Sequence, residues 1–489
     1  MKSILTWFLI AIGTLMSSAH AQAVKPFSPK LIKKLADFGA VGDGISDDTN
    51  ALKLALSQSG RYCLDGQNRT YRVSGTLRVT NSLCLSRATL SQSLEPFDPS
   101  PYISGKCPAT GNPFIIVDCG DANVPDDKFG ILRQSLALRT LFIKPAKPGD
   151  VLAVNLDRVK IDRGPYPDAG SRQDAAGIWL DGAERVDFRN VEISGGGKGY
   201  GLLLIRSRNI TLVGLHIHDI VWTPYKGDTA LKLAEVEAAG WNAVPIREFR
   251  TAGSAEGATQ NKFYGVRVQE QVTCAFLADV THVVIRNARI SRCMARFDVG
   301  DVPWQADGLD IGRSSSDILV TGKTSIDSTW EGVDVVASGE GVDGLALDGI
   351  LVSNSFSYGL KLGYKLSRAK VRAPVISGAG LAGILVYGPV RDVSIANADI
   401  RGMGSLTVAG ARLQPWASQT RVGVCLDEGS RGTEAEGRTP TQISISNVTV
   451  GGAIKSGSYE YGFSNHGATN VRVSHVQASD FRREALRGF

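Results

Sequence analysis

One short segment occurs three times between residues 306 and 362. The copies are Ala306–Ile311, Trp330–Val335 and Ser357–Leu362, and each has a glycine at its third position. These glycines, at 308, 332 and 359, are 24 and 27 residues apart. A period of this length, made of short strands with no helix between them, is typical of a solenoid of stacked β-coils. We therefore predict an all-β chain whose successive coils pair in parallel.

Stacking the copies places side chains from equivalent positions one above another. Two such columns are polar. The first contains Asp307, Glu331 and Tyr358, and the second contains Asp310, Asp334 and Lys361. Neighbouring parallel strands lie about 4.8 Å apart, so four carboxylates in adjacent coils repel one another and separate in pKa. The same positions in other coils are mostly apolar or small. Charge confined to three successive coils therefore indicates a functional site.

The rest of the chain continues the same pattern, with interruptions. Further coil glycines occur at 177, 201, 383, 423 and 462. Asparagines near the ends of a second set of strands are expected to bond turn backbone in a ladder; they are Asn190, Asn287, Asn397 and Asn447. Insertions at about 222–260, 403–419 and 429–442 are places for binding residues or for mere decoration. We predict one β-helix domain over residues 22–489.

The first 21 residues read as a secretory signal peptide. They combine Lys2, the apolar run Ile4–Met16 and a small-residue cleavage site at Ala19–Ala21. The apolar run is too short to span a membrane, and we expect a periplasmic or secreted protein without a membrane span. A formal net charge of +6 is mild and does not predict nucleic-acid binding.

An exported chain can keep disulfides, and this one has seven cysteines. Cys63 and Cys84 occupy similar strands about one coil apart, so we predict a bridge between them. Other pairings left open are Cys107 with Cys119 and Cys274 with Cys293, with Cys425 left over. No Cys/His spacing matches a zinc site. His216 and His218 alternate on one strand, and we expect one to face a turn and the other to be buried, in preference to the alternative of a metal site.

The stretch Ala36–Thr49 combines glycine turns with acidic residues. Ser46, Asp47 and Asp48 suit the N-cap of a helix expected over Ala51–Leu56, which would cover the open end of the solenoid; metal binding by these acids is the alternative. The stretch resembles the N-terminal signature of the pectate-lyase-like superfamily. With the repeats, the resemblance spans about residues 36–485. It implies a right-handed parallel β-helix with an N-terminal capping helix and loop insertions, and a glycan as substrate.

The repeated segment also resembles part of the polygalacturonase active site. Asp307–Ile311 is similar to the first catalytic motif of that family, Asp-Gly-apolar-Asp. In the next coil Glu331 falls on the second member of an Asp-Asp pair, and Trp330 replaces the first. Tyr358 stands where the family has a histidine, and its uronate-clamping Arg and Lys are not matched at 382–384. The resemblance implies carboxylate acid/base chemistry but not galacturonan as the substrate.

Glycoside hydrolysis needs one protonated and one ionised carboxyl group, and crowded carboxyl groups supply both states. We assign Asp307, Asp310, Glu331 and Asp334 as catalytic. Glu331 would be the general acid in an open groove, Asp307 or Asp310 the base, and Asp334 a modulator of their pKa values. At least one of the four should have a raised pKa. Retention and inversion of the anomeric centre both remain open.

Other residues near the repeat supply the expected substrate contacts. They are Tyr358, Lys361, Lys365, Arg313, Trp304 and Trp330. The tryptophans could stack on sugar rings or pack between coils. In a polysaccharide lyase, Lys361, Tyr358, Lys365 and Arg313 are available as the base and to neutralise the uronate, while Asp310 and Asp334 could hold Ca²⁺. A hydrolase needs no cofactor, and we assign no metal ligands to it.

These observations favour an exported polysaccharide-degrading enzyme. A glycoside hydrolase acting on an acidic or bacterial exopolysaccharide is the first hypothesis, and a lyase acting by β-elimination on a uronate is the second. A non-catalytic glycan-binding or adhesion β-helix and a C5-epimerase are the alternatives. The oligomeric state stays open between monomer and trimer.

Overall fold

The computed structural model describes residues 31–93, 139–147, 149–164, 176–196, 199–222, 272–295, 306–336, 340–355, 357–363, 365–402, 422–427, 439–451 and 459–489. The predicted signal peptide, most of the three insertions, Trp304, Cys107 and Cys119 lie outside these residues. Among the described residues, no helix is both long and apolar enough to cross a membrane.

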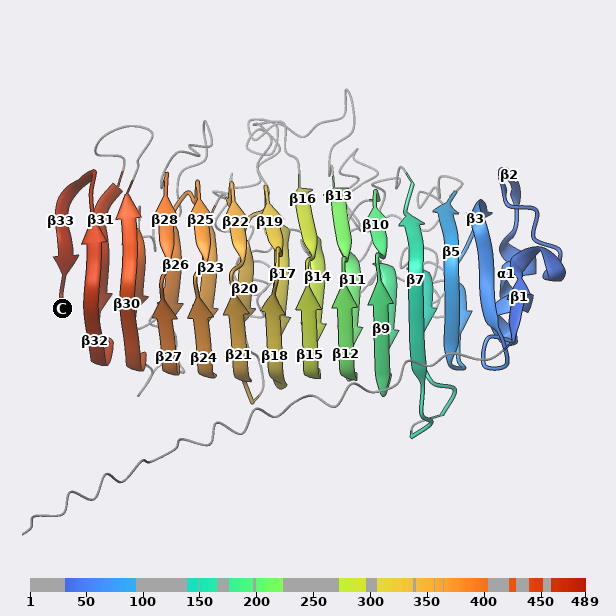
Figure 1. The fold of residues 1–489 in the computed structure, drawn as a ribbon, viewed down its shortest axis with the longest axis horizontal. Helices are drawn as coiled ribbons and strands as arrows, with labels where there is room; N and C mark the ends of the chain where they lie inside the picture. The colour runs from blue at the N-terminus through green and yellow to red at the C-terminus, as the bar shows by residue number, and fades with distance from the viewer. Residues whose placement is uncertain are drawn as a thin grey trace, which may run out of the picture.

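The described strands stack in parallel into one rod (Figure 1). Twelve of them form sheet B: β4 (Leu77–Val79), β6 (Arg139–Ile143), β8 (Ala176–Asp181), β11 (Gly199–Ile205), β14 (Val272–Ala278), β17 (Ala306–Gly312), β20 (Val333–Val336), β23 (Tyr358–Gly363), β26 (Ala382–Tyr387), β29 (Val422–Asp427), β31 (Tyr459–His466) and β33 (Phe481–Arg487). The predicted right-handed parallel β-helix is confirmed. Its extent as a single domain over 22–489 stays a prediction.

Sheet A forms the other two sides of each coil. One side contains β9 (Arg185–Arg189), β12 (Arg208–Val213), β15 (Thr281–Arg286), β18 (Ser315–Thr321), β21 (Val342–Asp348), β24 (Leu366–Arg372) and β27 (Arg391–Ala396). The other contains β10 (Glu192–Ser194), β13 (His216–Trp222), β16 (Arg289–Ala295), β19 (Ser325–Asp327), β22 (Leu351–Ser353), β25 (Val375–Ser377) and β28 (Asp399–Arg401). Long strands run across both sides and join them: β3 (Cys63–Val73), β5 (Leu83–Gln92), β7 (Ala153–Asp162), β30 (Thr441–Gly451) and β32 (Thr469–Ala478).

The predicted asparagines occupy the corner between the two sides of sheet A. Asn190, Asn287, Asn397 and Asn447 have φ angles of 50° to 56°, a left-handed conformation that asparagine tolerates better than most residues. The side-chain oxygen of Asn287 accepts the Lys323 amide at 2.9 Å, and Asn447 donates to Asn397 at 3.2 Å. The four asparagines thus share a corner conformation, and one of them bonds turn backbone as expected; a continuous ladder stays a prediction.

The coil glycines are required by close stacking. A Cβ on Gly308 would lie 2.7 Å from the Gly332 carbonyl oxygen, and one on Gly332 would lie 2.5 Å from that of Gly359. The three predicted glycines thus occupy equivalent points of successive coils. At the same point of β14 stands Cys274, which the sequence analysis did not recognise as a coil position. Its side chain is instead joined to Cys293 of β16.

Two disulfides connect the described cysteines. Cys63 and Cys84 are Cα partners in β3 and β5, 4.6 Å apart, which confirms the predicted bridge between neighbouring coils. Cys274 and Cys293, 5.7 Å apart, form the second bridge. Cys425 is a buried free thiol, and burial strongly raises its pKa.

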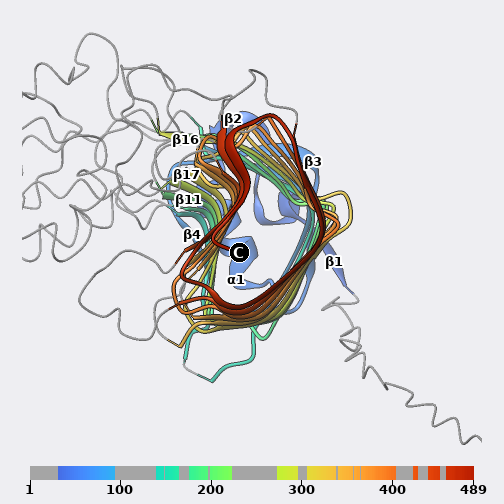
Figure 2. The ribbon, with the colours of Figure 1, turned by 90° about the vertical axis from the view of Figure 1, so that its left-hand side faces the viewer.

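The N-terminal end of the rod is covered as expected. Strands β1 (Ile32–Lys34) and β2 (Asp43–Asp47), the 3-10 turn η1 (Leu35–Phe38) and helix α1 (Thr49–Ser57) close it, and Figure 2 shows α1 across the far opening of the coil. The helix buries Leu52 and Leu56 against the core. Asp47 accepts the Thr49 amide at 2.9 Å, and Asp48 accepts that of Val41 at 2.6 Å. Both carboxylates thus accept hydrogen bonds from backbone amides of the covering segment, which favours a structural role over metal binding.

Candidate functional site

Strand register brings the two polar columns together on the outer side of sheet B. Asp310 is the Cα partner of Asp334 in β20, and Asp334 is the partner of Lys361 in β23. Three residues earlier, the Gly308 amide donates to the Glu331 carbonyl at 2.9 Å, which holds Asp307 beside Glu331. The four predicted catalytic carboxyl groups therefore lie in two adjacent coils, with Lys361 in the next; we call these five residues the acidic cluster.

The acidic cluster is buried. Glu331 is 1% exposed, the three aspartates are 6% each, and Lys361 is 9%. The expectation of Glu331 in an open groove is therefore wrong. Trp330 and Tyr358 beside it are almost fully buried as well, and Lys361 reaches back to its carboxylate. Glu331, Trp330 and Tyr358 are thus all largely removed from water.

Lys361 is the counter-charge of the cluster. Its Nζ donates to Glu331 Oε2 at 2.9 Å and to Asp334 Oδ2 at 3.0 Å. It also lies 5.9 Å from the ring centroid of Tyr387. A buried ammonium between two carboxylates is held by strong, charge-assisted hydrogen bonds. Lys361 is therefore engaged within the cluster, whereas the sequence suggested a substrate ligand.

Burial and repulsion raise the pKa of two members. The pKa of Asp310 is well above its usual range, first because of burial and then because of the charge on Asp334. The pKa of Asp334 is also well above its usual range, again from burial and then from the charge on Glu331. The expected raised pKa is thus present. Lys361 donates a hydrogen bond to Glu331 and to Asp334 alike, and its charge opposes the rise in the pKa of Asp334.

Three carboxylates of the cluster come close enough to share a cation. One oxygen each from Asp307, Glu331 and Asp334 lie within 4.8 Å of one another. Ca²⁺ prefers six to eight oxygen ligands, and the Lys361 ammonium already occupies the space between two of the three carboxylates. The arrangement fits an internal lysine better than a resident divalent ion, and the Ca²⁺ that a lyase would need stays untested.

Two predicted substrate ligands lie at corners of the coil, away from the acidic cluster. Arg313, in the turn after β17, is half-exposed and 3.5 Å from Asp279 Oδ2. Lys365, in the turn after β23, lines a hollow of about 340 Å³ together with Arg391. Both have left-handed φ angles, so they form corners and do not continue the outward columns. Nearness in sequence did not imply nearness in space.

The structure also adds aromatic and basic residues of sheet B to the surroundings of the acidic cluster. Tyr387 lies four positions after the coil glycine at 383, outside the two columns that were compared. On the N-terminal side of the cluster, the guanidinium carbon of Arg139 lies 3.8 Å from the Trp179 ring centroid and 4.6 Å from that of Phe142. Tyr200 stacks on Phe276 with centroids 5.6 Å apart. Trp179 and Tyr200 stand at positions of the two compared columns, where they were read only as uncharged; including further outward positions and the coils of β6 and β14 would have found the others.

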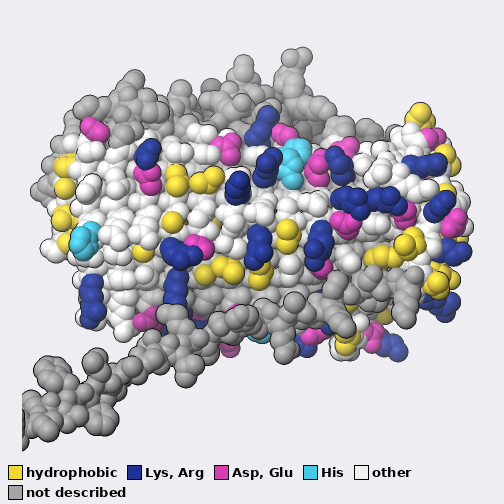
Figure 3. Space-filling view, viewed as in Figure 1, with side chains coloured by type: hydrophobic (Ala, Val, Ile, Leu, Met, Phe, Trp, Pro, Cys, Tyr) yellow, Lys and Arg dark blue, Asp and Glu magenta, His cyan; other side chains and the backbone are white. Residues whose placement is uncertain are grey.

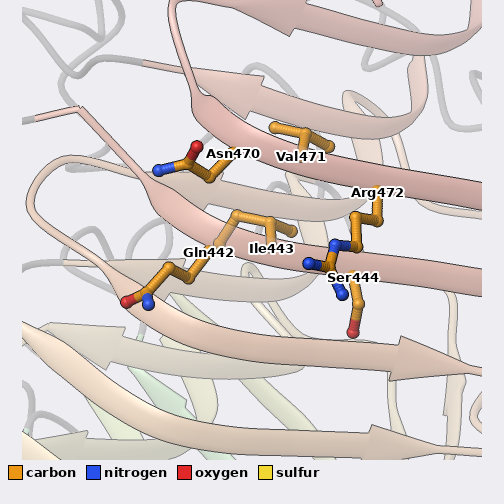
Figure 4. A pocket seen from close by; sticks show the side chains of 6 residues that line it. All are labelled: Gln442, Ile443, Ser444, Asn470, Val471 and Arg472. Carbon is orange, nitrogen blue, oxygen red and sulfur yellow. The ribbon is translucent and has the colours of Figure 1, made fainter.

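Another hollow, of about 480 Å³, lies over the last two long strands and is lined by Gln442, Ile443, Ser444, Asn470, Val471 and Arg472 (Figure 4). Gln442 and Asn470 are corner residues with left-handed φ angles. This hollow contains no carboxylate and does not extend the acidic cluster.

The two histidines of β13 differ from expectation. His216 and His218 are both partly exposed on the outer side of sheet A, and their ring centroids are 4.2 Å apart. The idea of one turn-facing and one buried histidine is wrong, because residues two apart on a strand point to the same side. Burial, and then the charge of His218, lower the pKa of His216.

Strand pairing and site together define the class of the molecule: a right-handed parallel β-helix with a buried acidic cluster on the outer side of one sheet. It is similar to the surface adhesin PfbA of Streptococcus pneumoniae at 11% identity and a TM-score of 0.48, over 93% of this chain and 91% of that one. It is also similar to the A-module of the mannuronan C-5 epimerase AlgE6 of Azotobacter vinelandii, at 14% identity and a TM-score of 0.41, over 92% and 99% of the chains.

A third similar structure is a family 28 exopolygalacturonase of Yersinia enterocolitica, at 11% identity and a TM-score of 0.39, over 94% and 78% of the chains. These neighbours are right-handed β-helix proteins, as the sequence resemblance implied. No protein-family profile and no curated protein matches the chain. With TM-scores below 0.5, the fold assignment depends on this chain's own strand pairing.

Proposed function

We propose that this protein is an exported polysaccharide-cleaving enzyme, a glycoside hydrolase acting on an acidic or bacterial exopolysaccharide. The observation that carries the proposal is the acidic cluster, which keeps proton-holding and ionised carboxyl groups side by side. Such a cluster is costly to bury, and strongly shifted pKa values are typical of functional sites.

The contacts within the cluster change which carboxyl group we assign as general acid and which as base or nucleophile. Glu331 was assigned as general acid from the sequence, but it accepts a hydrogen bond from Lys361, as Asp334 does, and this bond favours the ionised form of either carboxyl group. Asp310, whose pKa is raised and which accepts neither of these two bonds, is better placed to keep a proton for the leaving group. Glu331 or Asp307 then supplies the carboxylate that acts as base or nucleophile.

The distance between the catalytic carboxyl groups indicates whether hydrolysis retains or inverts the anomeric configuration. Retaining enzymes have catalytic carboxyl groups about 5–5.5 Å apart, and inverting enzymes about 6.5–9.5 Å. Oxygens of Asp307, Glu331 and Asp334 lie within 4.8 Å, so a working pair drawn from these three favours retention. A pair that includes Asp310 leaves both outcomes open.

The substrate class follows from the charges on the same face. Arg78 is exposed at the N-terminal end of sheet B, 5.0 Å from the Phe142 ring centroid, with Arg139 beside the same ring. Arginine binds carboxylates well, and aromatic rings stack on sugars and cations. This combination supports a polymer that contains acidic sugars.

The test is cleavage of a panel of acidic bacterial exopolysaccharides, followed by release of reducing ends. Glu331→Gln keeps the size of the side chain but removes its charge, so it should lower turnover by roughly 10²-fold or more, the scale of acid/base catalysis. Asp343→Asn, at an exposed ion pair of sheet A, is the matched control and should stay active. Near wild-type cleavage by Glu331→Gln would end the hydrolase proposal.

Two alternatives predict different outcomes of the same assay. A lyase could use Lys361 as its base, and it would then yield ultraviolet-absorbing unsaturated ends and lose activity with Lys361→Ala while Glu331→Gln stayed active. A non-catalytic glycan-binding protein is favoured by the burial of Glu331, because a buried cluster can also be structural. Binding of a polymer without any release of ends would select this second alternative.

A further inference from the structure

Strand β13 places two imidazole rings on the outer side of sheet A. Glu192 of β10 is the Cα partner of His216, and Arg289 of β16 is its partner on the other side. Figure 3 shows a histidine patch over β13 with basic and acidic side chains around it. The acidic cluster lies on sheet B and does not use this surface.

The rings are held in a defined arrangement. The centroids of His216 and His218 are 4.2 Å apart, with the ring planes inclined by 28°. His218 Nδ1 lies 2.7 Å from Asp219 Oδ2, and its Nε2 lies 3.7 Å from Glu192 Oε1. The other oxygen of each acid forms an ion pair: Asp219 Oδ1 lies 2.9 Å from Arg292 Nε, and Glu192 Oε2 lies 3.0 Å from Lys160 Nζ.

These contacts decide which ring nitrogen is the donor. A carboxylate only accepts hydrogen bonds, so His218 Nδ1 carries the hydrogen that Asp219 accepts. In the neutral ring the lone pair is then on Nε2, directed toward Glu192. A metal-binding histidine usually has its other nitrogen fixed by a carboxylate in this way, and Arg292 in turn fixes Asp219.

We propose that His216, His218 and Glu192 form a surface site for one divalent transition-metal ion, of which Zn²⁺ is the test case. Imidazole nitrogen and carboxylate oxygen are donors that Zn²⁺ accepts. The two histidines, one residue apart on an exposed strand, chelate from one coil, and Glu192 adds a ligand from the preceding coil. The ion would therefore link neighbouring coils.

Binding requires the side chains to rotate from their present positions. Zn–N distances are about 2.0–2.1 Å, so Glu192 and the rings must turn toward a common point. The side chains of Glu192 and His218 are 30% and 23% exposed, which leaves them room to do so. Lys160 and Arg289 bring positive charge to the same surface, which limits the affinity but does not block Glu192 Oε1.

The experiment uses the untagged full-length protein, because a histidine tag would bind the same metals. Titration calorimetry with Zn²⁺ should show one equivalent bound. His216→Ala and His218→Ala should each weaken binding about tenfold or more, on the scale of losing one ligand, and Glu192→Gln should weaken it less. His282→Ala, another exposed histidine 3.6 Å from a carboxylate, Asp317, but without a second ring beside it, should bind like the wild type.

A second measurement distinguishes loss of the metal ligand from misfolding of a variant. Zn²⁺ should raise the thermal unfolding midpoint of the wild type, since a ligand that binds only the folded state stabilises it. It should not raise that of His216→Ala or His218→Ala, while the metal-free midpoints stay close to that of the wild type. No binding by the wild type, or undiminished binding by both histidine variants, would overturn the proposal. Binding that is lost in Asp334→Asn and kept in His218→Ala would place the ion in the acidic cluster and overturn it too.

Discussion

Charges are stacked on both sheets of this molecule, with opposite results. On sheet A, Asp343 pairs with Arg368 and Asp348 with Arg372, each from the next coil, in water-exposed pairs. The hydrogen bond from each arginine lowers the pKa of its aspartate. On sheet B, burial raises the pKa of Asp310.

The difference teaches how a repetitive fold can serve two purposes. Equivalent positions of successive coils always meet, so the sequence decides whether opposite or like charges come together. Opposite charges in water need no further support. Like charges in a buried site destabilise the folded state unless some of the groups take up a proton or pair with an opposite charge. In the acidic cluster, Lys361 supplies the opposite charge and the raised pKa values favour protonation. Because burying such a cluster costs free energy of folding, its presence suggests a function.

The largest expected effect is on activity. Asp310→Asn removes a proton that the hydrolase needs and should reduce turnover by about 10²–10⁴-fold, measured as release of reducing ends under saturating substrate. Asp348→Asn removes the same group from the exposed ladder and should leave turnover unchanged. Equal losses in both variants would mean that the two regions do not differ in function.

The next largest effect is on stability. Lys361→Met leaves buried carboxylates without their counter-charge, which costs about 3–5 kcal/mol when one partner of a buried pair is removed. The free energy of unfolding, measured in urea, should fall more at pH 8 than at pH 5, because protonated carboxyl groups need less compensation. A loss that is independent of pH would assign Lys361 a packing role only.

The stability contributions of Asp310 on sheet B and Asp343 on sheet A should change in opposite directions with pH. The pKa of Asp310 is raised in the folded state, so its contribution is fully present below the unfolded pKa of about 3.9 and is lost as the pH rises toward the folded pKa. Asp343 has a lowered pKa, so its contribution is present above that value and is lost as the pH falls.

Asp310→Asn should therefore gain stability over the wild type as the pH rises above 4. The slope for one group is at most about 1.4 kcal/mol per pH unit, and urea unfolding at several pH values measures it. Asp343→Asn should show the opposite trend, with a loss that disappears in acid. A difference between Asp310→Asn and the wild type that stays flat from pH 4 to 8 would contradict the raised pKa.

The smallest effect belongs to the exposed ladder. Arg368→Met should barely move the urea midpoint, because exposed ion pairs are weak and screened by salt. The small difference from wild type should shrink further in 1 M salt. A large, salt-insensitive loss would show that the ladder stabilises the rod as strongly as the buried cluster does, and the contrast between the sheets would disappear.

Sequence reasoning reached the fold because the fold is periodic. The glycine spacing 308, 332 and 359 placed three coils in register, and the Cys63–Cys84 bridge followed from a similar one-coil offset. It failed where periodicity was interrupted: the coil of Cys274 was missed, because a cysteine replaces the glycine there. Corner residues such as Arg313 also look adjacent to the site in sequence but turn away from it.

What the sequence by itself determined is therefore what repeats: parallel coils, the columns that bring Asp310, Asp334 and Lys361 together, and the covering helix at one end. What only the tertiary structure decided is how those groups share charge and exposure. That Lys361 pairs with Glu331 and that Glu331 is nearly inaccessible depend on side-chain directions and on neighbours from other coils. A period specifies which residues meet, whereas burial and protonation depend on everything packed around them.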